Sequence, residues 1–462
     1  MPKQPGGAAP LTRRFLWMLA LGVALLLGCS ITPQPDLERI YQRVSSQPKK
    51  APLIFIPGIL GSRLVDVSTG NPVWPRSLLS VALGRNLDLL ALPVEGVESG
   101  LPLPSLRPDG LFLSIAGESF YRDMVHTLER IGGYDCVGPD RIRGDTDCVL
   151  FAWDWRRDMV DAAARLDALV ERLRALRADP DLKVDLVAHS AGGLVARYFL
   201  RFGGEDVLDR DEAEIAHRGG YKVRKAILVG TPNYGSISAL QESITGMPVG
   251  LGHLSPETLA TMPVQAQLLP HPDRSWMVDI RGDRIDLELF DVETWRENRW
   301  SIFDPRARKR IASRFESPAS AEAYLSGLET VFERSLRRGA RFHRALSEPR
   351  QDSPHKMIVF GGDCHMTPAR CLLEQVDGES RVHLHPRQIL DPIEGIDYER
   401  LMLEPGDGKV TKSSLLARDS LDPTEGESGD FRIDYEFFVC EKHSRLAENV
   451  TFRDNLLNIL LD

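Results

Sequence analysis

The sequence predicts an α/β protein with a mostly parallel central sheet and helices on both of its faces. Two observations favour this class. Short apolar runs alternate along the chain with helical patterns, as they do when strands are joined by crossover helices. The chain also has 462 residues, of which 42% are hydrophobic, enough to bury a large core. The expected strands are residues 53–56, 149–153, 184–188, 226–229 and 357–360.

Three helical patterns lie between and after these strands. The first has apolar residues on one face from Leu166 to Leu176 and stops at Asp179-Pro180. The second follows Ser190 directly. The third begins at Ser317-Pro318, where the serine can cap the helix and the proline suits its first turn.

The N-terminus predicts export and lipid attachment. Two arginines precede residues 15–28, an apolar stretch that is short for a membrane span and typical of a signal-peptide core. It ends in LLGC, which resembles the bacterial lipobox, so Cys29 is the predicted lipidation residue. A cleaved signal or an uncleaved anchor helix is the alternative. Ser30 after the cysteine favours the outer membrane of a bacterial envelope.

Composition and pattern divide the chain into five parts. Residues 1–29 are the signal peptide, and the polar, proline-containing residues 30–50 are a tether. The core should comprise residues 51–235 and 351–462. Between them, residues 236–350 interrupt the alternation of strands and helices, and we expect them to form a cap, or lid, over the sheet's C-terminal edge.

Charge and cysteine content limit the partners and the compartment. The formal net charge of −9 argues against nucleic acid, because phosphate binding needs a basic face. Export permits disulfides among the cysteines after Cys29. Short spacing predicts the pairs Cys136–Cys148 and Cys364–Cys371, which leaves Cys440 as a buried thiol.

The stretch AHSAG at 188–192 places Ser190 where an apolar strand turns into a helix. In an α/β-hydrolase this junction holds the nucleophile, and small neighbours permit the sharp turn. A structural serine is the alternative. A serine nucleophile needs a histidine base and a carboxylate that orients the base.

Asp407, on a glycine-flanked turn, and His443, before the terminal helix, follow Ser190 in the order that this fold uses. A turn aspartate and a surface histidine are the alternatives. The backbone N–H groups of Ala191 and of Ile59, in the loop 57–62, are the expected oxyanion donors. A tight strand connection without a ligand is the alternative for that loop.

Several segments taken together resemble the lecithin:cholesterol acyltransferase family, which includes lysosomal phospholipases and bacterial relatives. The resemblance implies an α/β-hydrolase fold with the triad and oxyanion donors given above. It also implies a structural ion pair at Asp154-Trp155-Arg156. The segments are IFIPGILGSRL at 54–64 with Val73-Trp74-Pro75, FAWDWRRD at 151–158, LVAHSAGGLVARY at 186–198, LVGTPNYGS at 228–236, PGDGKV at 405–410 and the tail around His443.

The sequence departs from the family at two places. Ala188 replaces the first glycine of the elbow, which should be harmless. Residues 62–115 contain no cysteine to staple the lipid-contacting loop found in animal members. Docking by that segment is therefore in doubt, although some of its side chains are apolar enough to touch a lipid surface. These are Trp74, Leu78, Leu79, Val81 and Leu83.

Other polar residues have simpler interpretations than catalysis or metal binding. His189 should pack or form local hydrogen bonds, because neighbouring strand residues point to opposite faces. His383 and His385 alternate on a strand without a carboxylate cluster, so a surface position is favoured over a metal site. His365 should lie in a loop. Three arginines, at 337, 338 and 341, should form a solvated helix face or, second, contact anionic lipid.

The sequence thus predicts a serine-dependent hydrolase or O-acyltransferase acting on phospholipid or other glycerolipid esters. It would need no cofactor and no metal. The acyl group would pass from Ser190 to water, an alcohol or a sterol. A lipase or carboxylesterase on neutral esters is the alternative within enzymes, and a non-catalytic lipoprotein that binds lipid or a partner is the alternative outside them.

Overall fold

The computed structural model describes most of the chain. The described residues are 35–43, 45, 47, 51–115, 118–210, 215–347, 353–376, 379–419, 421 and 429–461. The predicted signal peptide at 1–29 and its lipidation residue Cys29 lie outside them. Within the described part of the chain, no helix is both long and apolar enough to cross a bilayer.

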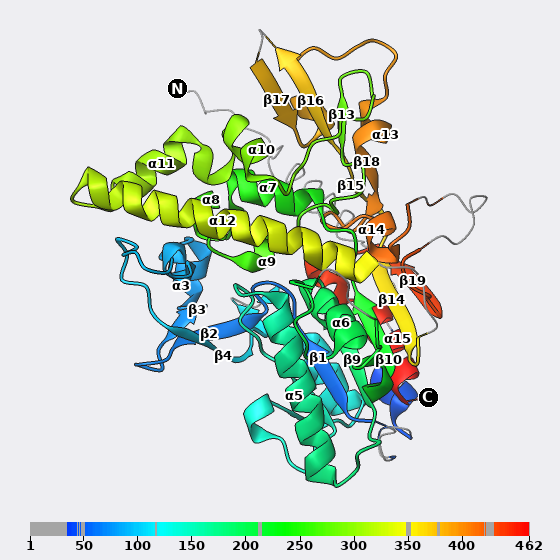
Figure 1. Cartoon of the computed structure of the whole chain (residues 1–462). Helices are drawn as coiled ribbons and strands as arrows, with labels where there is room; N and C mark the ends of the chain where they lie inside the picture. The colour runs from blue at the N-terminus through cyan, green and yellow to red at the C-terminus, as the bar shows by residue number, and fades with distance from the viewer. Residues whose placement is uncertain are drawn as a thin grey trace, which may run out of the picture.

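Seven parallel strands form the central sheet (Figure 1), which confirms the predicted α/β class. Their order is β19-β14-β10-β9-β1-β8-β7, so β9 lies in the middle. All five predicted strands are present. The patterns missed only the two edge strands, because β7 has two residues and no residue of β19 is buried. The bounds are β1 Leu53–Ile56, β7 Cys136–Val137, β8 Cys148–Leu150, β9 Val184–His189, β10 Val223–Val229, β14 Lys356–Gly362 and β19 Tyr435–Val439.

Helices cover both faces of this sheet, and the alternation of side chains along the strands explains why. Ile54 of β1 belongs to the apolar cluster that contains the inner sides of α5 and α6. Its neighbour Phe55 belongs to the cluster on the other face, with α4 and α15. Both faces of the strands are therefore buried, as the apolar runs require. The helices are α4 Arg122–His126, α5 Met159–Arg177, α6 Ala191–Phe202, α14 Lys412–Leu416 and α15 Val450–Leu461.

Two small antiparallel sheets and a short helix follow β1, within the segment whose docking to lipid the sequence left in doubt. Trp74 of this segment is only 2% exposed, and its indole N–H donates to Leu60 O at 2.9 Å, so this apolar side chain is packed inside the protein and does not face a lipid surface. Leu79, by contrast, is 64% exposed. The elements are β2 Ser62–Asp66, β3 Pro72–Trp74, α3 Leu78–Ala82, β4 Leu106–Leu111, β5 Ser114–Ile115 and β6 Glu118–Ser119.

The cap lies across the C-terminal edge of the sheet, with the 30-residue helix α12 spanning it (Figure 1). It has its own apolar cluster, built around Trp295 and Leu328. Its elements are α7 Ile237–Thr245, β11 Met247–Val249, β12 Gly252–Leu254, α8 Pro256–Leu259, α9 Pro263–Ala266, β13 Met277–Asp279, α10 Val292–Glu297, α11 Pro305–Ala312 and α12 Pro318–Ser347.

Strands from beyond residue 350 complete the cap. β13 pairs with β16, which pairs in turn with β17, so part of the segment expected in the core extends the cap instead. A second short pair, β15 and β18, leads the chain back toward the sheet. The elements are β15 His365–Pro368, β16 Cys371–Val376, β17 Glu379–His383, α13 Tyr398–Met402 and β18 Leu403–Gly406.

Part of the expected tether lies against the folded body. Helix α2 (Leu37–Tyr41) buries Leu37 and Tyr41 in a cluster with Leu457 of α15. The Tyr41 hydroxyl donates to Asp454 O at 2.8 Å. The segment is polar overall, but these two apolar side chains one helical turn apart are enough to dock it.

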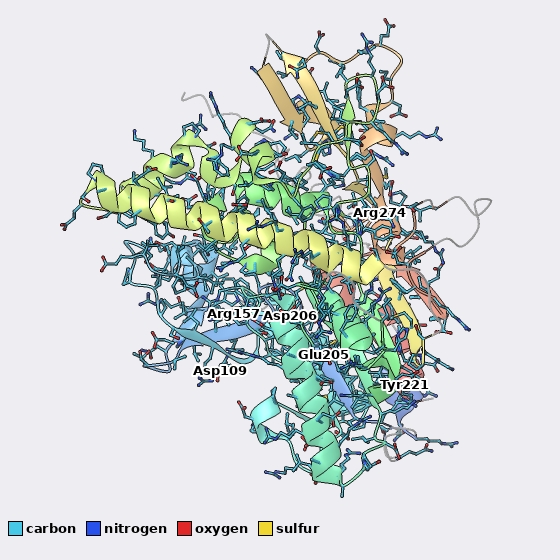
Figure 2. All side chains as sticks on the ribbon, in the orientation of Figure 1. Asp109, Arg157, Glu205, Asp206, Tyr221 and Arg274 are labelled. Carbon is cyan, nitrogen blue, oxygen red and sulfur yellow. A yellow bond between two sulfur atoms is a disulfide. The ribbon has the colours of Figure 1, made fainter. Side chains whose placement is uncertain are left out.

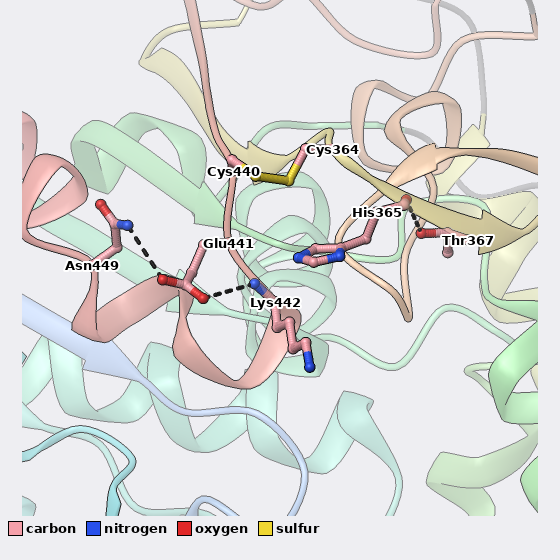
Figure 3. The surroundings of a disulfide bond; sticks show 7 residues. All are labelled: Cys364, His365, Thr367, Cys440, Glu441, Lys442 and Asn449. Atoms are coloured by element: carbon pink, nitrogen blue, oxygen red, sulfur yellow. Dashed lines mark hydrogen bonds between the residues drawn. A yellow bond between two sulfur atoms is a disulfide. The ribbon is translucent and has the colours of Figure 1, made fainter. Parts of the chain in front are cut away.

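The cysteine pairing differs from the prediction at one of two sites. Cys136 and Cys148 form the predicted disulfide, which joins the edge strand β7 to its neighbour β8. The predicted Cys364–Cys371 pair is wrong. Cys364 bonds Cys440 instead (Figure 3), and Cys371 rather than Cys440 is the buried thiol.

Sheet topology explains this pairing. Cys364 follows β14 and Cys440 follows β19, and Gly362 of β14 pairs with Val439 of β19. The two cysteines therefore leave the sheet side by side, although 76 residues separate them in the sequence. Cys371 begins β16 and packs into the apolar cluster of the cap, so its short spacing from Cys364 was misleading.

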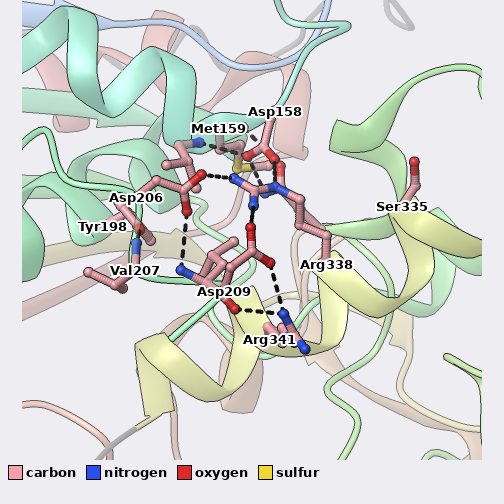
Figure 4. A network of polar contacts seen from close by, with 12 residues as sticks. Asp158, Met159, Tyr198, Asp206, Val207, Asp209, Ser335, Arg338 and Arg341 are labelled. Carbon is pink, nitrogen blue, oxygen red and sulfur yellow. Dashed lines mark hydrogen bonds and ion pairs between the residues drawn. The ribbon is translucent and has the colours of Figure 1, made fainter. Parts of the chain in front are cut away.

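Ion pairs from α12 connect the cap to the core (Figure 4). Arg338 donates to Asp158, the N-cap residue of α5, and its Nη2 lies 2.6 Å from Asp206 Oδ2. Asp206, labelled in Figure 2, follows α6. Arg341 pairs with Asp209 at 2.8 Å. The predicted solvated face is therefore wrong for Arg338, which is 21% exposed, whereas Arg337 is 65% exposed.

We expect Arg338→Ala to lower the free energy of unfolding by about 3 kcal/mol, because Asp158 is left largely buried without its arginine. Arg337→Ala removes the same charge one residue earlier and should change the free energy by less than about 1 kcal/mol. Denaturant unfolding of both variants and the wild type measures the difference. Equal stability of the two variants would contradict this account of the cap contact.

Candidate active site

Ser190 lies at the sharp turn between β9 and α6, where the sequence placed it. Its φ of 55° and ψ of −129° are strained for a residue with a Cβ, so surrounding packing must hold the turn. The glycines that follow make this packing possible. A Cβ on Gly192 would lie 2.6 Å from Ile56 O, and one on Gly193 would lie 1.9 Å from Thr231 Oγ1. The small residues therefore let α6 begin directly against β1 and the end of β10.

The structure brings the three predicted catalytic residues together. His443 Nε2 lies 2.9 Å from Ser190 Oγ, and His443 Nδ1 lies 2.7 Å from Asp407 Oδ2. Ser190 follows β9, Asp407 follows β18, and His443 follows β19. Because a carboxylate only accepts hydrogen bonds, Nδ1 carries the proton. Nε2 then accepts the serine hydroxyl.

Asp407 is held as an anion in a buried turn. Burial alone would raise the pKa of its carboxyl. The His443 ring and two backbone donors outweigh burial and leave this pKa below its usual value. The donors are the N–H groups of Lys409, at 3.0 Å, and Val410, at 2.8 Å, both to Oδ1. The His443 N–H donates to Asp407 O at 2.9 Å, so the backbones of these two residues are also joined.

The loop after β1 lies beside Ser190. A Cβ on Gly58 would lie 2.8 Å from Ser190 Cβ, which only glycine avoids. Gly61 N–H donates to Gly58 O at 3.1 Å and closes a turn around Ile59 and Leu60. Within the described part of the chain, the N–H groups of Ile59 and Ala191 donate no hydrogen bond.

Side chains of the segment FAWDWRRD, at 151–158, form hydrogen bonds to the loop 57–62. Trp153 Nε1 donates to Pro57 O at 2.8 Å, and Trp155 Nε1 donates to Ser62 O at 3.1 Å. Asp154 and Arg156 form the expected buried ion pair, with Nη2 2.8 Å from Oδ2. The two tryptophans therefore hold both ends of the loop 57–62, a role that the sequence did not reveal.

Two further side chains touch this site. The Tyr121 hydroxyl lies 2.8 Å from His189 Nδ1, and His189 Nε2 lies 3.2 Å from the carbonyl oxygen of His443. The expected local hydrogen bonding of His189 is therefore found. Tyr121 was missed, because it precedes the short helix α4 in a segment without a recognisable motif.

The disulfide Cys364–Cys440, drawn in Figure 3, lies close in the sequence to residues that contact Asp407 or form its hydrogen-bonding partner. Cys440 precedes His443 by three residues. Two residues before Cys364, a Cβ on Gly362 would lie 2.9 Å from Asp407 Cβ. The crosslink therefore joins the loop of His443 to the turn after β14, which packs against Asp407.

Three further histidines, His365, His383 and His385, were predicted to lie in a loop or at the surface rather than to bind a metal. In the described residues, no group of three or more histidine, cysteine or acidic side chains could hold a metal ion. His383 is buried and pairs with Glu374 at 2.6 Å, so its expected surface position is wrong. His385 caps the short helical turn that follows it. His365 begins β15 rather than lying in a loop.

A pocket of about 580 Å³ lies between cap and core beside the Asp407 turn. Tyr234, Trp276 and Arg274 are among its lining residues, and Lys409 belongs to it from the core side. Arg274 stacks on the Tyr234 ring at 3.4 Å. Neither Ser190 nor His443 lines this pocket, so it is separate from the serine site.

Comparison with known proteins agrees with the geometry. The family model of lecithin:cholesterol acyltransferase matches residues 110–280, which include Ser190. No curated protein sequence matches the chain significantly. A chain in the crystal structure of the Tle4–Tli4 complex superposes with a TM-score of 0.55 at 15% identity, covering 89% of this chain and 98% of that chain.

A more distant structure, mature lipase BlEst2 of Bacillus licheniformis, gives a TM-score of 0.32 at 12% identity, with 90% of this chain and 93% of that chain covered. That likeness is too weak to carry an argument. The family match supports, in general terms, an enzyme that hydrolyses or transfers acyl groups of lipid esters. The fold is that of an α/β-hydrolase, and the resemblance to the lecithin:cholesterol acyltransferase family is confirmed over residues 110–280.

Proposed function

We propose that this protein takes an acyl group from a phospholipid or other glycerolipid ester onto Ser190 and passes it to water, an alcohol or a sterol. One observation carries the proposal. The His443 ring contacts Ser190 Oγ with one nitrogen and the ionised Asp407 with the other, which is the arrangement that activates a serine hydroxyl.

The first half of the reaction follows from this arrangement. Ser190 Oγ attacks the ester carbonyl carbon while His443 Nε2 takes the hydroxyl proton. Asp407 stabilises the imidazolium that forms. The negative charge that develops on the carbonyl oxygen is stabilised by the N–H groups of Ile59 and Ala191. When the tetrahedral intermediate collapses, His443 returns the proton to the leaving alcohol and the acyl group stays on Ser190.

The second half repeats these steps with a new nucleophile. His443 takes a proton from water or from an acceptor alcohol, whose oxygen attacks the acyl carbon. Collapse breaks the bond to Ser190 Oγ, which recovers its proton from His443. The cap decides between hydrolysis and transfer, because transfer requires that water be kept from the acyl-enzyme.

Two exposed apolar side chains support a lipid surface as the source of substrate. Leu79 of α3 is 64% exposed, and Leu251, at the tip of the hairpin formed by β11 and β12, is 85% exposed. The two segments are in contact, because Leu251 N–H donates to Ala82 O at 2.9 Å. Two exposed leucines on touching segments thus give the protein apolar side chains that a lipid surface can cover.

The proposal is tested by product analysis with full-length protein in mixed phosphatidylcholine–detergent micelles, with and without a sterol or long-chain alcohol. Wild type should release fatty acid or form a new ester, and Ser190→Ala should lower the rate by at least about 10³-fold. Ser326→Ala, on the exposed side of α12, is the matched control and should behave as wild type.

Each outcome has a clear meaning. A serine-dependent ester on the added alcohol identifies an acyltransferase, and fatty acid alone identifies a phospholipase. Turnover of simple esters without phospholipid turnover would make the enzyme a lipase or carboxylesterase on neutral esters. No turnover by wild type on any ester would overturn the proposal in favour of a non-catalytic lipoprotein.

We expect removal of the Cys364–Cys440 disulfide to impair catalysis more than removal of Cys136–Cys148. The paired change Cys364→Ser with Cys440→Ser releases the loop of His443 from the turn after β14 that packs against Asp407, and kcat should fall about tenfold or more. Cys136→Ser with Cys148→Ser should leave kcat within about twofold of wild type. The chain-entropy model gives stability losses of roughly 4.5 and 3 kcal/mol, respectively.

The measurement is kcat per folded molecule on a soluble ester, with folding followed by circular dichroism. Both variants lose one crosslink, but only one of the two crosslinks lies near His443. A difference in kcat between the variants therefore reports on the positioning of His443 rather than on the loss of a disulfide as such. Equal kcat values in the two variants would show that the disulfide near the site has no special role in catalysis.

We propose further that acyl chains on Cys29 hold the enzyme at the bacterial envelope, on the outer membrane. The apolar stretch before LLGC and Ser30 after it support this location. Cys29→Ser should move the protein from the detergent phase to the aqueous phase in Triton X-114 partitioning of cell envelopes. Retention of the variant in the detergent phase would instead favour an uncleaved anchor helix.

A further inference from the structure

A series of hydrogen bonds through Tyr121 and His189 connects two of the loops that form the proposed catalytic site. Gly58 N–H donates to the Tyr121 hydroxyl oxygen at 3.1 Å. The same oxygen lies 2.8 Å from His189 Nδ1, and His189 Nε2 lies 3.2 Å from the carbonyl oxygen of His443. This hydrogen-bond chain begins at Gly58 in the loop 57–62, which we call the oxyanion loop, and ends at the backbone carbonyl of His443.

The chemistry of the partners sets the direction of every bond. The carbonyl oxygen of His443 can only accept, so His189 Nε2 carries a proton. In a neutral ring Nδ1 then accepts, and it receives the Tyr121 hydroxyl proton. The hydroxyl oxygen in turn accepts from Gly58 N–H. Each polar group of the chain is satisfied only in this arrangement.

Burial keeps both side chains neutral. Burial, and next the nearby His443, lower the pKa of His189 to about 3, and burial raises that of Tyr121. A neutral His189 matters because its ring centroid lies 5.1 Å from that of His443, where a second positive charge would oppose the imidazolium. Packing holds Tyr121 in place, with its ring edge-on to Phe55 at 5.0 Å.

The two ends of the chain are the backbone atoms on which the geometry of the site depends. Gly58 immediately precedes Ile59, and it lies so close to Ser190 that a Cβ would clash. At the other end, the carbonyl of His443 fixes the main chain from which the imidazole projects. The chain therefore holds an oxyanion donor and the base in register on either side of the serine.

We propose that Tyr121 and His189 are positioning residues, which keep the oxyanion loop and His443 aligned and thereby set the rate of the chemical step. This inference rests on the proposed function. It assigns no contact with substrate to either side chain. It also gives a reason for a histidine next to Ser190, since few side chains can accept at one end and donate at the other.

The test compares kcat and KM on p-nitrophenyl butyrate for full-length variants. Tyr121→Phe removes only the hydroxyl, and His189→Leu removes both ring nitrogens; each should lower kcat about tenfold or more with KM within about twofold. His189→Gln carries an acceptor and a donor at nearly the spacing of the imidazole nitrogens. It should retain kcat to within about threefold.

Two further variants separate positioning from general damage. The double variant Tyr121→Phe with His189→Leu should be no slower than the worse single variant, because both break one chain. Tyr398→Phe, in the cap, is the matched control. Its buried hydroxyl also accepts a backbone N–H, from Ile393 at 3.0 Å, and donates to Ile280 O at 2.8 Å. This variant should lose stability but keep wild-type kcat.

The outcomes distinguish failure of this inference from failure of the proposed function. If Ser190→Ala is inactive while Tyr121→Phe and His189→Leu match wild type, or if their effects multiply in the double variant, only the positioning role is overturned. If Ser190→Ala keeps its activity, the proposed function fails and the positioning role fails with it.

A second measurement does not depend on turnover. Long-range ¹H–¹⁵N spectra of histidine-labelled protein should show His189 neutral at pH 5, with its proton on Nε2. Tyr121→Phe should shift the His443 signals as well as those of His189, and Tyr398→Phe should shift neither. A protonated His189, or one with its proton on Nδ1, would overturn the hydrogen-bond chain itself.

Discussion

The parallel order of the central strands is the constraint on which the rest of the structure depends. Because β9, β10, β14 and β19 all run in one direction, their carboxyl ends meet at the same edge of the sheet. Segments 253 residues apart thereby place Ser190 Oγ and His443 Nε2 within 2.9 Å. The strained backbone of Ser190 is held between this edge and α6, where glycines allow contact that other residues would prevent.

Around this edge the molecule uses several independent supports. Two tryptophans hold the loop after β1, the ion pairs of Arg338 hold the cap, and a disulfide joins the loop of His443 to the turn after β14. Contacts of this kind keep hydrogen-bond donors and acceptors fixed before a reaction begins. Fixed groups stabilise the charge that develops in a reaction better than groups that must first move into place.

Much of the fold could be predicted from the sequence. So could the three residues, Ser190, Asp407 and His443, that the structure brings into contact. Apolar runs buried on both faces identified five of the strands, and the small residues after Ser190 identified the turn. What was missed had weak local signals. β19 has no buried residue, the cap strand β16 looked like part of the core, and Tyr121 lies outside any motif.

The sequence by itself determined the features that depend on neighbours along the chain: strand and helix periodicity, the glycine-rich turns, and the order of serine, acid and histidine. Only the tertiary structure decided the features that depend on which strands lie next to each other. Cys364 pairs with Cys440 because β14 adjoins β19, and Tyr121 reaches His189 across 68 residues. Local spacing carries no information on such contacts, because sheet order brings distant residues together and keeps near ones apart.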